Sequence, residues 1–290
     1  MPKQYKTAQA FRAALEDRLK QMAKGNAAEL VRLRRHVAFD RLLARFFAEA
    51  NPPWILKGGY TFELRSRQKS RVTRDMDLSV PIPVAIKAGS DLDQIDRVKI
   101  LLQKSALHDL HDWFEFRVGE PMHDLDAAPY GGARFPIEVR MANRRFATFH
   151  LDVGLGDAVV SAPEWLVAHD FLGFAEISPP RVAVLPREQQ FAEKIHAYTL
   201  PRGDRGNTRV KDLVDLVLLI QLGLPNAAQV KVALTATFER RQTHPIPIAL
   251  ALPPEAWQAQ YADLAAECDL AQKHVRDGFT FVATFWETLI

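Results

Sequence analysis

The sequence predicts an α+β protein, because helical and strand patterns occupy separate stretches of its 290 residues. Residues 7–22 and 26–50 carry apolar residues mostly three or four positions apart and contain no proline, which indicates two amphipathic helices. Short apolar or alternating runs between residues 54 and 153 indicate strands. After residue 187 the apolar spacing is again helical.

The first predicted strands enclose a glycine pair. Prolines at 52 and 53 end the second helix, and the apolar residues 54–56 are predicted to form a short buried strand. Gly58 and Gly59 are expected to begin a helix that reaches about Arg65. A basic loop then covers residues 66–74, and the next strand is predicted at 76–80.

The remaining elements follow from the same patterns. A helix is expected at residues 91–110 with Asp91 as its cap, and alternating runs at 113–118, 135–141 and 145–153 predict a meander of strands. Candidate helices lie at 187–200, 209–222, 226–242 and 255–288. Because the pattern changes between residues 160 and 187, we expect one domain at residues 1–160 and a mainly helical one at 161–290.

Composition places the chain among ordinary globular proteins. It is 48% hydrophobic and 25% charged, and no apolar run approaches the ~20 residues of a membrane span. Cys268 is the only cysteine, so the sequence provides neither a disulfide framework nor a cysteine zinc site. With no apolar signal segment at its start, the chain is expected in the cytoplasm and not at a membrane.

Positive charge is concentrated at the N-terminal end. Residues 1–74 hold 17 Lys and Arg against 6 Asp and Glu, whereas the remainder holds 21 against 29. This asymmetry is compatible with a polyanionic partner such as RNA or DNA. A solvated helical surface that carries basic side chains is the alternative interpretation.

Asp75 and Asp77 are the leading candidates for a metal site. They lie two residues apart at the start of a predicted strand, so both side chains can reach one hard cation such as Mg²⁺. The glycine pair upstream lets phosphate oxygens approach backbone N–H groups at a helix N-terminus. Two solvated carboxylates at the end of a strand are the alternative.

Asp152 is the candidate third carboxylate, since it lies within an apolar strand where an unpaired charge is costly. If its strand lies beside that of Asp77, three carboxylates can bind two metal ions, or bind one and deprotonate a hydroxyl. Asp157 is the competing candidate, although it follows Gly156 and is expected in a turn. A salt bridge to an arginine is the structural alternative for Asp152.

Two predicted helices near the C-terminal end carry further charged candidates. Lys194 flanks the apolar face of its helix, from which it could hold a triphosphate. Asn207 or Thr208 is expected to cap the helix that follows, and Asp212 and Asp215 share one of its faces. Arg209 and Lys211 put cations in its first turn, where the helix dipole disfavours them, so an anionic ligand or a carboxylate partner is expected there.

Five motifs in order resemble those of one enzyme family. They are Leu-Lys-Gly-Gly (56–59), Ser-Arg-Val-Thr-Arg-Asp-Met-Asp (70–77), Leu-Asp-Val-Gly (151–154), Glu-Lys-Ile-His-Ala (193–197) and Arg-Val-Lys-Asp-Leu-Val-Asp-Leu (209–216). The combination resembles the AbiEii/MenT nucleotidyltransferase toxins, a branch of the DNA-polymerase-beta-like superfamily. The sequence lacks the Walker, dinucleotide-binding, zincin and nucleophile-elbow motifs of other enzyme classes.

The resemblance implies a bilobed protein, with an N-terminal mixed-sheet nucleotidyltransferase lobe and a helical C-terminal lobe. It implies a toxin of a bacterial toxin–antitoxin or phage-defence system, with a cognate antitoxin as partner. The toxin would move NMP from an NTP onto RNA with Mg²⁺ and release pyrophosphate. Relatives of this kind add pyrimidine nucleotides to the 3′ end of tRNA, which blocks translation.

The resemblance also assigns roles to residues. The implied catalytic residues are Asp75, Asp77, Asp152, Lys194 and Asp212, and the first three of these bind metal. The implied NTP-binding residues are Lys57, Gly58, Gly59, Thr73, Lys194, Arg209, Lys211 and Asp215. From the basic charge we expect RNA contacts at Arg34, Arg35, Arg65, Arg67, Lys69 and Arg71.

Two other functions remain open from the sequence. A catalytically silent protein of the same fold could bind nucleic acid or an antitoxin, and an active enzyme could transfer NMP to a protein hydroxyl. The preferred NTP, the number of nucleotides added, the oligomeric state and the mode of neutralisation do not follow from the residues.

Overall fold

The computed structural model describes residues 5–66, 70–80, 93–124, 128–203, 206–224 and 226–290. The chain divides into two compact units, which are described separately. The first consists of Met1–Leu64, Val72–Gly156 and Trp165–Val184, and the second of Arg65–Arg71, Asp157–Glu164 and Leu185–Ile290. Each unit therefore includes segments that are far apart in the sequence.

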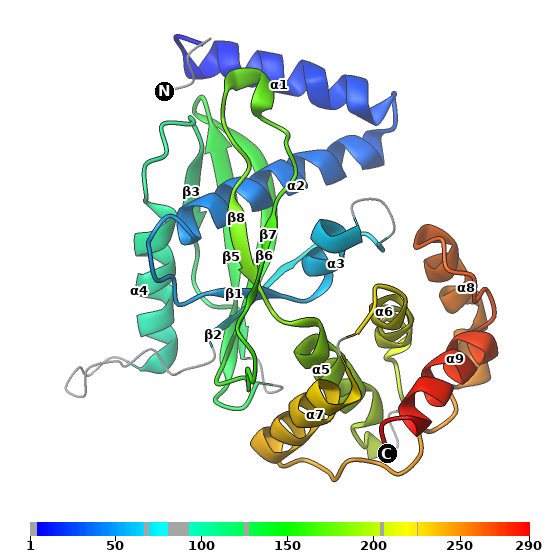
Figure 1. Cartoon of the computed structure of the whole chain (residues 1–290). Coiled ribbons are helices and arrows are strands. Elements are labelled where there is room, and N and C mark those ends of the chain that lie inside the picture. The colour runs from blue at the N-terminus through cyan, green and yellow to red at the C-terminus, as the bar shows by residue number, and fades with distance from the viewer. Residues whose placement is uncertain (1–4, 67–69, 81–92, 125–127, 204–205, 225) are drawn as a thin grey trace. The chain divides into compact units, whose positions relative to one another are not determined.

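The strands form one mixed sheet, shown in Figure 1. Its strands are β1 (Ile55–Lys57), β2 (Met76–Val80), β3 (Glu115–Val118), β4 (His123–Asp124), β5 (Gly132–Met141), β6 (Arg144–Leu155), β7 (Glu164–Val167) and β8 (Arg181–Val184). Their order is β3-β5-β6-β2-β1-β8-β7, and β4 pairs with β5. The pairs β2–β6 and β1–β8 are parallel, whereas β1–β2, β3–β5, β4–β5 and β5–β6 are antiparallel.

The helices described for the first unit are α1 (Ala8–Ala23), α2 (Ala27–Phe46), α3 (Gly59–Ser66, which ends in the second unit) and α4 (Gln94–Ala106). The side chains of Thr7, Asn26 and Asp93 cap α1, α2 and α4, each by accepting a backbone N–H of the first turn. Helix α2 packs on β6 and β8, and its apolar residues join those of the sheet in one buried core.

The second unit is built mainly of helices: α5 (Arg187–Thr199), α6 (Val210–Gln221), α7 (Ala227–Arg241), α8 (Gln258–Glu267) and α9 (Val275–Glu287). Helix α5 packs against α6 and α7, and α6 also packs against α8 and α9. The α6 helix is buried along most of its length, which agrees with its apolar sequence. Short 3₁₀ turns lie at Gly173–Ala175 in the first unit and at Glu255–Trp257 in the second.

The α+β prediction is confirmed, and so is a mixed sheet. The predicted strand 76–80 is β2, and the two predicted N-terminal helices end within four residues of their expected positions. The meander is confirmed by the antiparallel pairs β3–β5 and β5–β6. The bilobed arrangement and the domain boundary at residue 160 stay predictions.

Two predictions about individual elements were wrong, and one strand was not predicted. The single helix expected at 255–288 is interrupted between α8 and α9, where Asp269 has a φ of 52° and His274 caps the start of α9. The helix expected at 91–110 begins at Gln94 with Asp93 as its cap, and Asp91 lies outside the described residues. The edge strand β7 was not predicted, because it is only four residues long.

Within the described residues, the structure contains no helix that is both long enough and apolar enough to cross a membrane.

Candidate functional site

The sheet of the first unit brings the predicted carboxylates to neighbouring strands. Asp77 on β2 lies opposite Asp152 on the parallel strand β6, and Asp75 immediately precedes β2. The condition set for Asp152, that its strand lies beside that of Asp77, is therefore met. Side chains that are paired in register point to the same face of a sheet, so Asp77 and Asp152 share one face.

The same face carries two cations in register with these carboxylates. Arg134 on β5 pairs with Asp152, and Lys57 on β1 pairs with Asp77. One row of residues across β5, β6, β2 and β1 thus reads Arg134, Asp152, Asp77, Lys57. Opposite charges on neighbouring strands stabilise this face, where the two adjacent aspartates alone would repel each other.

Arg134 makes a bidentate contact in this row. Its Nε and Nη2 atoms donate to the two carboxylate oxygens of Asp152, both at 2.7 Å, and Nη2 lies 3.7 Å from Asp75 Oδ2. The hydrogen bond to Asp152 and the negative charges of Asp152, Asp75 and Asp77 together raise the pKa of Arg134, against a smaller opposing effect of burial. His150 Nδ1 also lies 3.4 Å from Asp75 Oδ1.

The turn between β1 and α3 approaches the Asp77 side chain closely. Gly58 has a φ of 70°, and a Cβ atom at this position would overlap the Asp77 carboxylate. A Cβ at Gly59 would overlap the hydroxyl of Thr73. Glycine is required at both positions, because one backbone is left-handed and both lie against functional side chains.

Thr73 is buried at this turn and is held by Glu63 of α3. The Thr73 backbone N–H donates to Glu63 Oε1 at 3.1 Å, and its Oγ1 atom has no hydrogen-bond partner among the described residues. Glu63 Oε2 in turn lies 2.8 Å from His36 Nε2 and 3.5 Å from Arg32 Nη1 on α2. A buried hydroxyl without a partner beside a glycine turn suits an acceptor group of a ligand, such as a phosphate oxygen.

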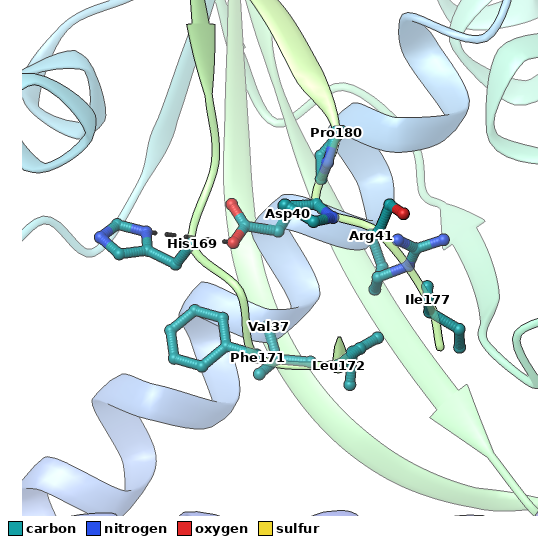
Figure 2. Close-up of a pocket in the computed structure, with 10 residues that line it drawn as sticks. Val37, Asp40, Arg41, His169, Phe171, Leu172, Ile177 and Pro180 are labelled. Carbon is teal, nitrogen blue, oxygen red and sulfur yellow. Dashed lines mark ion pairs between the residues drawn. The ribbon is translucent and has the colours of Figure 1, made fainter. Parts of the chain in front are cut away.

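A second polar cluster connects α2, α3 and the segment after β7. Tyr60 donates its hydroxyl to Asp40 Oδ1 at 2.5 Å, and His169 Nδ1 is 4.0 Å from Asp40 Oδ2. Asp40, His169 and Phe171 line a small cavity with a volume of about 10 Å³. Figure 2 shows these side chains. This volume holds about one water molecule, so the cavity is far too small for a nucleotide.

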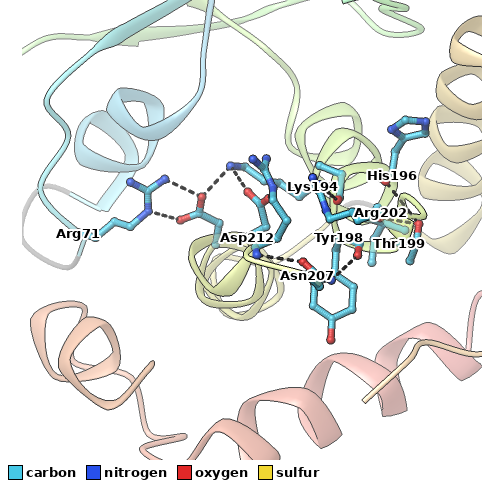
Figure 3. A network of polar contacts seen from close by, with 12 residues as sticks. Arg71, Lys194, His196, Tyr198, Thr199, Arg202, Asn207 and Asp212 are labelled. Atoms are coloured by element: carbon cyan, nitrogen blue, oxygen red, sulfur yellow. Dashed lines mark hydrogen bonds and ion pairs between the residues drawn. The ribbon is translucent and has the colours of Figure 1, made fainter. Parts of the chain in front are cut away.

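The second unit contains a separate buried ion-pair network, shown in Figure 3. Lys194 Nζ on α5 lies 2.8 Å from Asp212 Oδ1 and 2.8 Å from Asp215 Oδ2, both on α6. Arg71 donates from Nε and Nη2 to the two oxygens of Asp215, both at 2.9 Å. Arg209 donates to the second oxygen of Asp212.

These contacts shift the ionisation of the network. Burial lowers the pKa of Lys194, but the charges of Asp212 and Asp215 outweigh it, so the pKa is raised overall. Burial likewise raises the pKa of Asp215, and the charges of Arg71 and Lys194 outweigh it, so the pKa falls well below its usual range. Lys194 and Asp215 are therefore both charged at neutral pH.

The start of α6 differs from the prediction. Arg209 is the N-cap residue and makes no side-chain cap, whereas Asn207 accepts the backbone N–H of Arg209 at 2.9 Å and so orders the turn before the helix. The prediction that Asn207 or Thr208 caps the helix was wrong by one or two residues. The expected carboxylate partner for the first-turn cations is Asp212, which binds Arg209, while Lys211 is exposed.

The arginines expected to contact RNA differ in their surroundings. Arg65 is buried and donates to Gln190, Glu164 and the carbonyl of Leu185, so its guanidinium serves the packing of the second unit. Arg71 is likewise bound to Asp215, and Arg34 pairs with Glu16. The prediction of RNA contacts at Arg65 and Arg71 is therefore not supported by their burial. Arg67 and Lys69 lie outside the described residues.

Arg35 remains the best placed of these arginines. Its Nη1 donates to the Thr73 carbonyl at 3.3 Å, next to the candidate site. Partial burial and the nearby charge of Arg74 lower the pKa of Arg35, whereas Asp75 and Glu63 raise it less. Its guanidinium therefore adds positive charge beside Asp75.

The competing third carboxylate, Asp157, has a different environment. It is buried in the second unit, where Arg241 Nη2 lies 3.2 Å from its Oδ1 atom. It follows β6 and is not in the row of Asp77 and Asp152. Sequence reasoning did not find Arg134, Glu63 or His36, because only the strand register and the packing of α2 on α3 bring them to the site.

The donor set suits one hard divalent cation. Asp75 and Asp77 offer carboxylate oxygens, and Mg²⁺ is commonly held by one or two carboxylates together with water and substrate phosphates. Both carboxylate oxygens of Asp152 accept hydrogen bonds from Arg134. Among the described residues, no three His, Cys, Asp or Glu side chains lie close enough together to form a metal-binding group.

A comparison with protein families decides the identity. The family described as "Nucleotidyl transferase AbiEii toxin, Type IV TA system" matches residues 41–288. The chain belongs to the AbiEii family. The predicted resemblance is thus confirmed, and the AbiEii chain is a toxin-type nucleotidyltransferase of a toxin–antitoxin system.

A comparison with solved structures finds the same fold in a toxin of this kind. MenT4, a nucleotidyltransferase toxin from Mycobacterium tuberculosis H37Rv, is 17% identical to this AbiEii chain, with a TM-score of 0.57 over 94% of this chain and 98% of its own. An antigenic nucleotidyltransferase-like protein from Paracoccidioides brasiliensis is also 17% identical, with a TM-score of 0.44 over 71% of this chain and 88% of its own. The likeness to MenT4 supports the fold, whereas the second likeness is too weak to carry an argument. No curated protein matches the chain significantly.

Proposed function

We propose that this toxin transfers NMP from an NTP to RNA, with the 3′ end of tRNA as acceptor and Mg²⁺ as cofactor. The observation that carries this proposal is the arrangement of Asp75 and Asp77 beside the Gly58 turn, in register with Asp152. Carboxylates next to a phosphate-binding turn suit a reaction in which a metal and a triphosphate meet.

The reaction follows from this chemistry. The 3′-hydroxyl oxygen attacks the α-phosphorus, the bond from this phosphorus to the bridging oxygen breaks, and pyrophosphate leaves with the electron pair. The hydroxyl proton passes to solvent or to a carboxylate of the site. A divalent cation bound by Asp75 and Asp77 would neutralise the charge on the transferred and leaving oxygens.

Each unit, taken by itself, carries residues that we propose as candidates for binding the triphosphate. In the first, Lys57, Gly58, Gly59 and the Thr73 hydroxyl would contact phosphate oxygens, which the unpartnered Thr73 Oγ1 supports. In the second, Lys194 would hold the triphosphate, with Asp212 and Asp215 orienting its ammonium group. Arg209 and Lys211 would add positive charge at the start of α6.

The partners follow from the family. A member of a toxin–antitoxin system has an antitoxin partner and nucleotide substrates. We further propose that RNA is bound near Arg35 and Arg34, that the transferred nucleotide is a pyrimidine, and that the toxin acts in the cytoplasm, where tRNA and NTP are present.

The acceptor can be tested with labelled nucleotides. Wild-type protein is incubated with each α-labelled NTP in turn and with either intact tRNA or tRNA whose 3′-terminal ribose has been oxidised with periodate. We expect label in intact tRNA alone, because oxidation removes the attacking hydroxyl. Label in oxidised tRNA to the same extent, or in protein instead of RNA, would exclude the 3′ end as the acceptor.

A further inference from the structure

We propose that Arg134 supplies the positive charge that a second metal ion would otherwise provide, that it binds phosphate oxygens of the NTP, and that Asp152 positions Arg134 and does not bind metal. This inference rests on the proposed function, because it assigns the residues that recognise the nucleotide of that reaction. It replaces the expectation that three carboxylates hold the metal.

The geometry of Asp152 supports the first part. Both of its oxygens accept hydrogen bonds from Arg134, at 2.7 Å each, and its side chain is only 14% exposed. A bidentate pair of this kind is among the stronger side-chain contacts and fixes the guanidinium plane. A metal ion bound to Asp152 would have to share its oxygens with the Arg134 guanidinium, whose positive charge repels a cation at this distance.

The position of Arg134 supports the second part. Its side chain is 32% exposed, so it is accessible to a ligand, and Nη2 also lies 3.7 Å from Asp75. Arg134 therefore faces the pair of carboxylates that suits one Mg²⁺. The planar guanidinium matches phosphate geometry, and its charge cannot be lost by deprotonation at neutral pH.

The chemical demand explains why a second cation is needed. Sites that transfer phosphorus groups often use two metal ions to stabilise the attacking and leaving oxygens. Two carboxylates, Asp75 and Asp77, support one such ion, as in sites where phosphates and water complete the Mg²⁺ shell. A fixed arginine can supply the other positive charge, as arginine side chains do in other phosphoryl-transfer sites.

The test measures binding, without RNA. Mn²⁺ is titrated into the full chain by electron paramagnetic resonance with saturating α,β-methylene NTP, and the affinity for this analogue is measured at saturating Mn²⁺. Three proteins are compared with wild type: Arg134→Ala, the charge-neutral double variant Arg134→Ala/Asp152→Asn, and Arg140→Ala. Arg140 lies on the same strand in a partly exposed pair with Glu138, so it controls for the loss of a strand arginine.

We expect one Mn²⁺ per wild-type chain and one in the double variant, since Asp75 and Asp77 remain. Both Arg134 variants should bind the analogue about 10-fold or more weakly, the size expected for losing hydrogen bonds to a charged group. Arg140→Ala should bind it as wild type does. Because the double variant keeps the net charge, its weaker binding cannot come from an uncompensated Asp152.

Three results would overturn the inference: two Mn²⁺ in wild type, loss of Mn²⁺ in the double variant, or unchanged nucleotide affinity in both Arg134 variants. Two Mn²⁺ together with normal labelling of tRNA would reject the inference and keep the proposed function. If the wild-type chain binds one Mn²⁺ and its nucleotide binding depends on Arg134, but tRNA is not labelled, the inference would stand and the proposed function would be rejected. A wild-type chain that binds neither Mn²⁺ nor the analogue would reject both.

Discussion

Asp40 on α2 shows how burial sets the charge of a single side chain. Burial raises the pKa of Asp40 to about 8, although the hydrogen bond from Tyr60 partly opposes the shift. An unfolded aspartate releases its proton near pH 4, so between about pH 4 and pH 8 the folded state holds one more proton. Stability therefore falls as pH rises through this window and levels off above it.

The corresponding variant is Asp40→Asn, which keeps the shape of the side chain and cannot ionise. Between pH 5 and pH 7.5 we expect the unfolding free energy of wild type to decrease by about 1 kcal/mol per pH unit more than that of the variant. Urea denaturation at several pH values measures both slopes. Parallel slopes would show that Asp40 does not titrate in this range.

The ion-pair network around Asp215 leads to a prediction about stability at neutral pH. Asp215 is fully buried and neutralises both Arg71 and Lys194. Asp215→Asn leaves these cations short of a partner, and we expect a loss of about 3 kcal/mol or more in the unfolding free energy. Arg276→Ala, which breaks an exposed pair with Glu255, is the control and should change stability little. Equal small changes in both variants would refute this account of the network.

At the scale of elements, the turn from β1 to α3 determines where the Asp77 carboxylate lies. In Gly58→Ala, the added methyl group overlaps Asp77 and the backbone keeps a positive φ. Gly25 offers a matched control, because it has a φ of 81° and open space around its α-carbon. Both variants carry the same backbone strain of about 1–2 kcal/mol, but only Gly58→Ala moves a site carboxylate.

We therefore expect both glycine variants to lose stability through backbone strain, Gly58→Ala to lose somewhat more because of the overlap with Asp77, and a much larger loss of nucleotide transfer in Gly58→Ala alone. Thermal unfolding and α-labelled NTP transfer, measured on the same preparations, separate the two effects. If Gly58→Ala retained the activity of Gly25→Ala, the close approach of Gly58 to Asp77 would have no role in the site.

The elements also show what the sequence could predict. Strand β2 and the glycine turn were predicted well, because prolines and glycines mark their ends in the sequence. The register that places Asp152 opposite Asp77 and Arg134 opposite Asp152 was not predictable, since it depends on pairing between strands far apart in the chain. The break before α9 was missed because the apolar spacing continues through it.

At the scale of the whole molecule, the two units are interleaved along the chain. Arg71, which pairs with Asp215, and Arg65, which binds Gln190, come from the segment Arg65–Arg71 that precedes β2. This segment is part of the second unit, although it lies far from the rest of that unit in sequence. A boundary in sequence therefore does not separate the units cleanly.

This interleaving predicts the behaviour of a fragment. Residues 161–290 expressed alone lack Arg65 and Arg71, so Asp215 and Gln190 lose buried partners. We expect the fragment to unfold without a cooperative transition, whereas the full chain melts cooperatively. Circular dichroism during heating distinguishes the two, and a sharp transition in the fragment would show that the segment Arg65–Arg71 is dispensable for folding.

The central claim is that the carboxylates at the start of β2 drive nucleotidyl transfer to RNA. Its most direct test compares transfer of label from α-labelled NTP to tRNA, with parallel detection of pyrophosphate, for wild type, Asp77→Asn and the control Asp93→Asn, which alters only the cap of α4. We predict labelled tRNA and pyrophosphate with wild type and the control, and a loss of about 100-fold or more with Asp77→Asn. Equal transfer by wild type and Asp77→Asn would contradict the account.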